Sequence, residues 1–267
     1  MNIDYISDIH ANHHVFFKEE QREWERSTRE FANRLIDTDS VKDVLVVAGD
    51  ISDWSKQVFW ILDEFTKTYN IVFVVLGNHD YYLISNEDIE KYNSCSFRKI
   101  EMLKDMLSKN KKIQLLDKSV VEYNGKVFAG DTMWYYPNDI HDQYFYNFHM
   151  SDRQYILVNN DSPSKRLTLE LLKQMNKEAL DWYMTLEDKE IDVFVSHSPP
   201  VNNPKSPYPY NECFVTPVPF LVSKHWITGH QHTRYNFELG DTNFYMNPLG
   251  YPREHEFIKV KSFKIKK

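Results

Sequence analysis

Five short runs of β-forming residues recur along this chain of 267 residues, and polar side chains follow each of them. The runs are NIDYIS, DVLVVA, IVFVVL, DVFVS and KHWIT, which stand directly before Asp8, Gly49, Gly77, His197 and Gly229. Uninterrupted runs rich in Val and Ile are typical of strands that are buried on both faces. Such strands need helices to cover them, so the sequence predicts an α/β fold.

Amphipathic patterns between these runs predict the helices. Apolar residues recur three and four positions apart, as on one face of a helix. The predicted faces are Trp24, Thr28, Phe31 and Leu35; Val58, Ile61, Leu62, Phe65 and Tyr69; Phe97, Ile100, Leu103, Met106 and Leu107; and Leu169, Leu172, Leu180 and Tyr183. The alternation of strands with helices favours parallel βαβ units in the first part of the chain.

Antiparallel strands are expected in the rest of the chain. Asn124-Gly125 lies between two β-rich arms, which is the strongest short signal for a hairpin. The segments FELGDTNFYMNP and EHEFIKVKSF are also rich in β-forming residues. We therefore expect one domain over residues 1–267, built as a four-layer sandwich of two mixed β-sheets flanked by helices.

Two segments look irregular in the sequence. Seven of the eleven prolines fall between Pro199 and Pro219, which excludes a helix or a central strand and predicts a long surface loop. The run from Trp134 to Tyr155 is dense in aromatic residues and is long for a connection. It predicts either a loop packed on the core or a lid that stacks on a nucleobase.

The composition excludes several classes of protein. No apolar run approaches the roughly 20 residues of a membrane-spanning helix, and the start, MNIDYISDIH, lacks the basic residues of a secretory signal. Cys95 and Cys213 are too few for a disulfide framework or a CxxC site. A net charge of −7 argues against a protein that lives on nucleic acid or on anionic membranes. We expect a cytoplasmic protein, and the sequence predicts no oligomeric state.

Polar residues with metal-binding groups stand where the predicted strands end. The carboxyl ends of strands in α/β sheets form the ligand site, so these residues should meet. They are two carboxylates, one amide and five imidazoles, namely Asp8, His10, Asp50, Asn78, His79, His197, His230 and His232. Mixed nitrogen and oxygen ligands suit Zn, Mn or Fe better than Ca or Mg.

The number of these ligands favours two metal ions over one. Without His79, seven candidates remain, which exceeds one four-coordinate site and fits two ions that share a carboxylate. With two aspartates and a bridging hydroxide, two divalent ions keep a net charge of about +1. Such a site attracts an anion, and phosphate esters are the obvious candidates.

The segments DIH, GDISD, GNHD, SH and GHQH, in this order, resemble the five motifs of the calcineurin-like metallophosphoesterase superfamily. The resemblance spans Asp8 to His232. More locally, FAGDTMWYY, VSHSPP and NPLGY resemble a bacterial and phage subgroup of small predicted phosphoesterases. The resemblance implies the four-layer fold of that superfamily and a dinuclear centre. One metal would be held by Asp8, His10, Asp50 and His232, and the other by Asp50, Asn78, His197 and His230, with Asp50 as the bridge.

The same resemblance implies catalytic roles. His79 would protonate the leaving-group oxygen or hold the phosphoryl group. In the phosphoprotein phosphatase branch, the residue that matches Asp53 orients that histidine, and an arginine follows. Here Trp54 stands in its place, which removes a bidentate phosphate donor and argues against protein phosphatase activity. No substrate-binding residue is assigned.

Several residues keep a simpler interpretation. Asp53 could instead cap the helix that starts near Ser55. Asp80 is interpreted as a turn residue rather than a ligand. His13 and His14 are expected at a solvated helix start, with contact to substrate as the alternative. His225 and His255 are interpreted as structural.

The sequence therefore predicts a dinuclear metal-dependent phosphoesterase, a phosphatase or a phosphodiesterase, that acts through a metal-bridging hydroxide. The substrate is expected to be a small phosphate ester, with a nucleotide or cyclic nucleotide as the diester candidate. One alternative is a metal-dependent nuclease of the double-strand-break repair type, against which the negative charge argues. The other is a non-catalytic protein-binding scaffold, against which the complete set of ligands argues.

Overall fold

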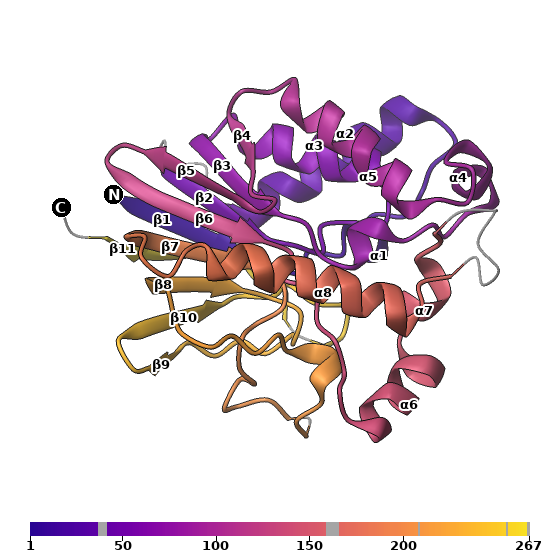
Figure 1. The fold of residues 1–267 in the computed structure, drawn as a ribbon. Helices are drawn as coiled ribbons and strands as arrows, with labels where there is room; N and C mark the ends of the chain where they lie inside the picture. Colours follow the sequence, from indigo (N-terminus) through magenta and orange to yellow (C-terminus); the bar gives the residue numbers. More distant parts are fainter. Residues whose placement is uncertain (37–41, 159–165, 208, 255, 266–267) are drawn as a thin grey trace.

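Two β-sheets lie face to face, and helices cover their outer faces (Figure 1). The structure is a computed structural model that describes residues 1–36, 42–158, 166–207, 209–254 and 256–265. The predicted four-layer arrangement of two mixed sheets is confirmed.

The first sheet takes the three N-terminal runs. Its strand order is β11 (Lys261–Lys264), β1 (Asn2–Ile6), β2 (Lys42–Ala48), β3 (Tyr69–Val75) and β4 (Ile113–Leu115). Strands β1 to β4 are parallel to their neighbours, and β11 is antiparallel to β1. The expected βαβ units are therefore present in this half of the chain.

The second sheet takes the remaining two runs. Its strand order is β5 (Ser119–Tyr123), β6 (Lys126–Asp131), β7 (Ile191–Ser196), β8 (Ser223–Thr228), β10 (Thr242–Met246) and β9 (Phe237–Leu239). Strands β6, β7, β8 and β10 are parallel, whereas β5 and β9 pair antiparallel with β6 and β10. The β5–β6 hairpin turns at Asn124-Gly125 as predicted, with both residues at positive φ.

Helices pack on both outer faces. The α-helices are α1 (Ala11–His14), α2 (Gln21–Leu35), α3 (Ser55–Phe65), α4 (Asn86–Lys91), α5 (Ser96–Ser108), α6 (Ile140–His149), α7 (Asp152–Tyr155) and α8 (Leu169–Met184). Short 3-10 turns, η1 (His79–Tyr81) and η2 (Glu212–Phe214), complete the described elements. The placement of Tyr69 on a helix face was wrong, because α3 ends at Phe65 and Tyr69 opens β3.

Three apolar layers separate the four layers of backbone. The layer between the sheets includes Tyr5, Val46, Phe73, Phe128 and Val195. The layer under α2, α3 and α5 includes Phe31, Val47, Ile61 and Leu103. The layer under α8 includes Ala179, Tyr183, Phe194 and Trp226. Neighbours such as Val46 and Val47 thus face different layers, which explains why the strand shows no polar alternation.

The two irregular segments carry more structure than expected. The aromatic run holds α6 and α7, so it is not a plain loop. Trp134, Tyr135 and Tyr146 are buried in the core, as one of the two interpretations predicted. The described part of the proline-rich segment contains only η2 as a regular element, yet Cys213 within it is fully buried.

Candidate metal centre

The ends of five strands from both sheets meet at one place. Asp8 follows β1, Asp50 follows β2, Asn78 follows β3, His197 follows β7 and His230 follows β8. Hydrogen bonds join the sheets here: the His230 backbone N–H donates to Asp8 Oδ1 at 2.8 Å, and His197 Nδ1 lies 2.9 Å from the Ala48 carbonyl. All seven predicted ligands therefore lie in one region, although they come from two sheets.

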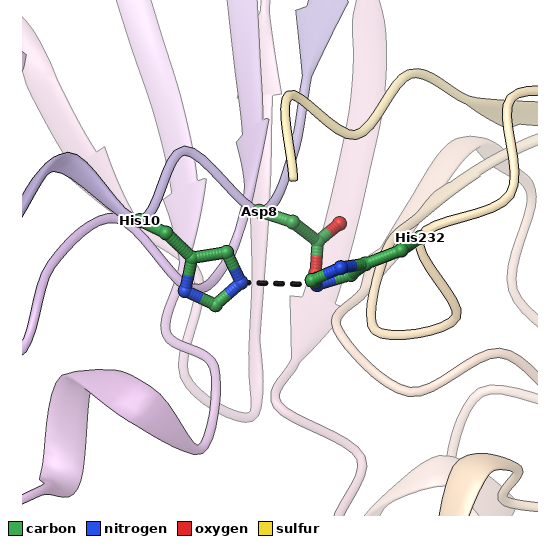
Figure 2. A group of neighbouring side chains, drawn as sticks. All are labelled: Asp8, His10 and His232. Atoms are coloured by element: carbon green, nitrogen blue, oxygen red, sulfur yellow. Dashed lines mark hydrogen bonds and ion pairs between the residues drawn. The ribbon is translucent and has the colours of Figure 1, made fainter. Parts of the chain in front are cut away.

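Asp8, His10 and His232 form a first candidate metal-binding group (Figure 2). The two imidazoles point their Nε2 atoms at each other across 3.0 Å, and Asp8 Oδ1 lies 3.6 Å from His232 Nε2. Asp8 Oδ2 is buried and has no hydrogen-bond partner among the described residues. A buried carboxylate oxygen without a donor is costly, and a cation at this point would satisfy it.

Asp50, His197 and His230 form a second candidate group. Asn78 joins it, because its Oδ1 lies 3.0 Å from His197 Nε2. Asp50 Oδ2 lies 3.3 Å from His197 Nε2 and 3.8 Å from His10 Nε2. The Asp50 carboxylate therefore stands between the two groups.

Hydrogen bonds on the outer ring nitrogens fix which nitrogen three of the histidines offer. His197 is held through Nδ1 by the Ala48 carbonyl, and His232 through Nδ1 by Glu254 Oε2 at 2.7 Å. His230 is held in the opposite sense, with Nε2 3.0 Å from the Cys213 carbonyl. Nε2 of His197 and His232 and Nδ1 of His230 are thereby left to bind a metal ion.

Most of these ligands hold an uncommon backbone conformation. The left-handed residues among them are Asp8, His10, Asp50, His230 and His232, with φ of 49°, 43°, 54°, 67° and 48°. Side chains other than glycine rarely adopt this region, and clusters of such residues are found at functional sites. Glycines make the room: a β-carbon on Gly77 would lie 2.1 Å from Asp50 Oδ1, and one on Gly229 2.6 Å from Asp8 Oδ2.

Burial and neighbouring charges shift the pKa values of the ionisable groups at the centre. Burial lowers the pKa of His230 to about 4, and the neighbouring His197 adds to this. Burial also holds the pKa of His10 well below its usual value. For His197, burial acts in the same direction, but the Asp50 charge outweighs it and raises the pKa to about 9. Burial raises the pKa of Asp50, yet the imidazoles of His197 and His79 hold it well below its usual range.

His79 forms a third candidate group with His10 and Asp50, although it does not belong to the predicted ligand set. Its Nδ1 lies 3.0 Å from Asp53 Oδ1, and its backbone N–H donates to Asp50 Oδ1 at 2.9 Å. Burial lowers the pKa of His79, but the charges of Asp50 and Asp53 overcome this and raise it to about 9. The alternative in which Asp53 caps a helix is wrong, because the N-cap of α3 is Trp54, with no side-chain cap bond.

Three residues at the centre were missed in the sequence. Tyr251 donates or accepts a hydrogen bond at His79 Nε2 over 3.0 Å and stacks on His10 with 4.4 Å between ring centroids. Tyr251 lies in the NPLGY segment, which stands out in the sequence as a resemblance but does not indicate a role for the tyrosine. Glu254 holds His232 as described above, and no pattern in the sequence marks it.

Asp152 is the third residue missed, and it is fully buried on α7. Its carboxylate accepts hydrogen bonds from Asn78 Nδ2 at 2.7 Å, from Tyr135 Oη at 2.5 Å and from the Tyr82 hydroxyl. Because the Asn78 amino group is held by Asp152, its Oδ1 is directed to the candidate ligands. Asp152 sits inside the aromatic run, where nothing in the sequence separates it from the surrounding polar residues.

The remaining sequence candidates lie at the edge of the centre or away from it. Asp80 lies in the turn, where its carboxylate accepts from four backbone N–H groups: Gly77, Asp50, Ile51 and Ser52. His14 bonds the Gly250 carbonyl, and the exposed His13 ring lies 4.8 Å from that of Tyr251. His225 bonds the Tyr245 hydroxyl, remote from the centre, and His255 lies outside the described residues.

Comparison with known proteins agrees with this geometry. A family model of calcineurin-like phosphoesterases matches residues 1–234. The chain belongs to this family. Calcineurin-like phosphoesterases hydrolyse phosphate esters, and the groups described above contain this chain's candidate metal-binding residues.

Two relatives illustrate how far the similarity reaches. The uncharacterized protein L509 of Acanthamoeba polyphaga mimivirus is 22% identical over 234 residues, which cover 79% of this chain and 79% of that protein. The crystal structure of phosphopantetheinyl hydrolase (PptH) from Mycobacterium tuberculosis superposes with a TM-score of 0.68 at 17% identity, over 95% of this chain and 90% of that chain. At this identity the likeness to PptH shows the calcineurin-like fold.

Among the described helices, none is both long and apolar enough to cross a membrane.

Proposed function

We propose that this protein is a two-metal phosphoester hydrolase. The position of Asp50 carries the proposal, because one carboxylate stands between two groups of nitrogen and oxygen donors. Asp8, His10 and His232 would hold one divalent ion and Asn78, His197 and His230 the other. The donor chemistry suits Mn, Fe or Zn. Bound ions of this kind supply a nucleophile at neutral pH and neutralise charge on the phosphoryl group.

The side chains around the ions position the reaction. Asp53 fixes the His79 ring through Nδ1, which leaves Nε2 to give a proton to the departing oxygen. Tyr251 occupies that nitrogen in the present structure, so its hydroxyl stands where an oxygen of the substrate would be received. Asp152 holds the amide of Asn78 in the orientation that a metal ion needs.

The experiment is metal loading followed by turnover. The purified protein is stripped with chelator, reloaded with Mn²⁺, Fe²⁺ or Zn²⁺, and its bound metal is counted. Hydrolysis of p-nitrophenyl phosphate and of bis-p-nitrophenyl phosphate is then measured beside Asp50→Asn. We expect about two ions per chain and turnover that the substitution lowers by a factor on the order of 100 or more. Less than one ion per chain without turnover would favour a scaffold, and rapid digestion of single-stranded DNA with Mn²⁺ a nuclease.

The proton-donating role of His79 has its own test. A general acid matters most when the leaving alcohol is a poor one. His79→Ala should therefore slow esters of alkyl alcohols by a factor on the order of 100, and p-nitrophenyl esters far less. An equal loss on both kinds of ester would assign His79 to binding of the phosphoryl group instead.

A further inference from the structure

A pocket of about 520 Å³ opens onto the candidate metal centre. Asp50, Asn78 and His230 line one part of it, and His79 and Tyr251 lie beside them. Its volume falls in the range of roughly 300–1,000 Å³ that is usual for small-molecule sites. A substrate whose phosphorus sits at the metal ions would place its alcohol group in the remaining space.

That remaining space is apolar and aromatic. Phe145 contributes from α6, Met150 from the position directly after it, and Phe214 from η2. The ring of Phe214 lies 6.1 Å from that of Phe145 and 5.4 Å from that of His230. Flat apolar surface of this kind binds rings and alkyl groups by burial and stacking.

The charge of the pocket disfavours a second negative group on the substrate. Among the described residues that line it, none is a lysine or an arginine. Glu254 adds a carboxylate to the lining. Arg153, the nearest arginine in sequence to the α6 wall, is not among the lining residues. A negative group on the alcohol of the substrate would meet no lysine or arginine in this lining, so an uncharged alcohol group matches it better.

Neutral hydrogen-bond donors complete the wall. Asn202 and Asn211 line the pocket and use their side-chain oxygens inside the protein: one accepts from Gln231 Nε2 and the other from the Cys213 backbone N–H, each at 2.8 Å. Their amino groups are thereby left as the donors that a ligand can meet. Such donors fit carbonyl or ring acceptors on an uncharged group.

The wall is fixed to the metal centre by hydrogen bonds. The Cys213 carbonyl holds His230, and Gln231 Nε2 donates to the Phe214 carbonyl at 3.3 Å. The Glu212 backbone N–H donates to Asp142 on α6 at 2.9 Å. The aromatic surface therefore keeps a set distance from the candidate ligands, as a specificity-determining surface must.

We propose that this pocket binds an uncharged alcohol group of a phosphate ester, and that Phe145 and Phe214 select this group. The inference rests on the proposed function, because it places the phosphoryl group at the metal centre. A nucleoside and a pantetheine-like amide chain both fit this chemistry: each is uncharged and carries hydrogen-bond acceptors on a largely apolar frame. The class of substrate is thereby narrowed to phosphate esters whose alcohol group is uncharged.

The experiment compares esters that differ in one feature. The Mn²⁺-loaded protein is given thymidine 5′-phosphate and its methyl ester, 4′-phosphopantetheine and its methyl ester, and the methyl phosphodiesters of benzyl alcohol and of 4-carboxybenzyl alcohol. We expect kcat/KM of the benzyl compound to exceed that of the carboxybenzyl one by about tenfold. The thymidine and pantetheine pairs distinguish a ring-binding from a chain-binding pocket.

Variants assign the effect to the wall. Phe214→Ala and Phe145→Ala, on different elements, should each raise KM for the benzyl diester about tenfold with little change in kcat. Phe148→Ala is the matched control, because it lies on α6 with 68% of its surface exposed. Ser151→Lys adds a cation to the lining and should lower KM only for the carboxybenzyl ester.

Binding to the metal-free protein separates the two proposals. Ligand-observed NMR should detect thymidine or pantetheine bound to the wild-type chain and to Phe148→Ala, and should lose the signal in Phe214→Ala. Bound alcohols without metal-dependent turnover of any ester would overturn the proposed function and leave the alcohol site standing. Turnover that favours the carboxybenzyl ester, or that is unchanged in both phenylalanine variants, would overturn the site.

Discussion

At the scale of single residues, the candidate ligands pair an uncommon backbone with close neighbours. A left-handed conformation brings Cβ near the following carbonyl oxygen and costs about 1–2 kcal/mol per residue. Asp8 and Asp50 hold it nonetheless, because hydrogen bonds to the His230 and His79 backbones lock their carboxylates in place. Residue identity here is set by chemistry at the centre rather than by stability of the chain.

Asp152 offers a test of how the centre is oriented. The Asp152 carboxylate accepts from three donors, and Asp152→Asn keeps the shape of the side chain but replaces one of its oxygens by an amino group that cannot accept. Asn78 should therefore lose its fixed orientation. We expect affinity for the second metal ion to fall about 10- to 100-fold, as measured by competition with a coloured chelator. Asp181→Asn, on the exposed side of α8, is the control and should bind both ions normally. Unchanged affinity in Asp152→Asn would remove its positioning role.

Lys99 predicts a dependence of stability on pH. It is fully buried on α5, where it donates to the carbonyls of Asp53 and Tyr82, each at 2.7 Å. Burial lowers its pKa to about 8, below the unfolded value of about 10.4. Between these values the unfolded chain binds more protons, so stability should rise with pH by about 2 kcal/mol. The free energy of unfolding in urea, measured at pH 8 and at pH 10, tests this. The same rise with pH in Lys99→Met would contradict it.

At the scale of elements, the turns that leave the strands shape the centre. Gly77 follows β3 and packs so closely against Asp50 that no side chain fits between them. Gly125 in the β5–β6 hairpin is a different case: its φ is +71° and nothing lies within 4 Å of where a β-carbon would be. One glycine makes room for chemistry, and the other only permits a turn.

The two glycines should respond differently to the same substitution. Gly125→Ala should lower the free energy of unfolding by about 1 kcal/mol through its positive φ, with metal content unchanged. Gly77→Ala should displace the Asp50 carboxylate and abolish binding of at least one ion. Guanidinium unfolding and metal counting on both proteins measure this. Full metal content in Gly77→Ala would show that Asp50 tolerates the displacement.

The elements also show which features the sequence could predict. All five runs of β-forming residues became strands, because burial on both faces leaves a recognisable apolar run. Tyr69 was misplaced because the helical period of α3 happens to continue into the next strand. Helices α6 and α7 were not foreseen, since aromatic residues crowd both their buried and exposed sides and hide the period.

At the scale of the whole molecule, the candidate centre joins two sheets, and among the described residues no named strand of one sheet pairs with a strand of the other. Asp8 and His230 are 222 residues apart in the chain and still share a hydrogen bond. That the candidate ligands meet could be predicted, because each follows a strand in a recognisable short motif. Asp152, Tyr251 and Glu254 could not, because their place at the centre depends on how distant segments pack.

Metal binding should therefore stabilise the entire fold. Ions that bind only the folded chain at 100 times their dissociation constant add about 2.7 kcal/mol per site. We expect Mn²⁺ to raise the Tm of the wild-type protein by several degrees and chelator to reverse it, as followed by scanning calorimetry. Asp50→Asn should show little of this shift. If Mn²⁺ left the Tm of the wild-type chain unchanged, this would contradict a metal centre between the sheets.

The left-handed ligands have a consequence for anyone who engineers this protein. Glycine adopts their backbone without strain, so replacing a ligand by glycine relaxes the chain while it removes a buried polar side chain. In a mutant library selected for heat resistance in a chelating buffer, such variants should be enriched. Such a selection would then favour variants that have lost the centre, and only a selection that also measures turnover would retain it.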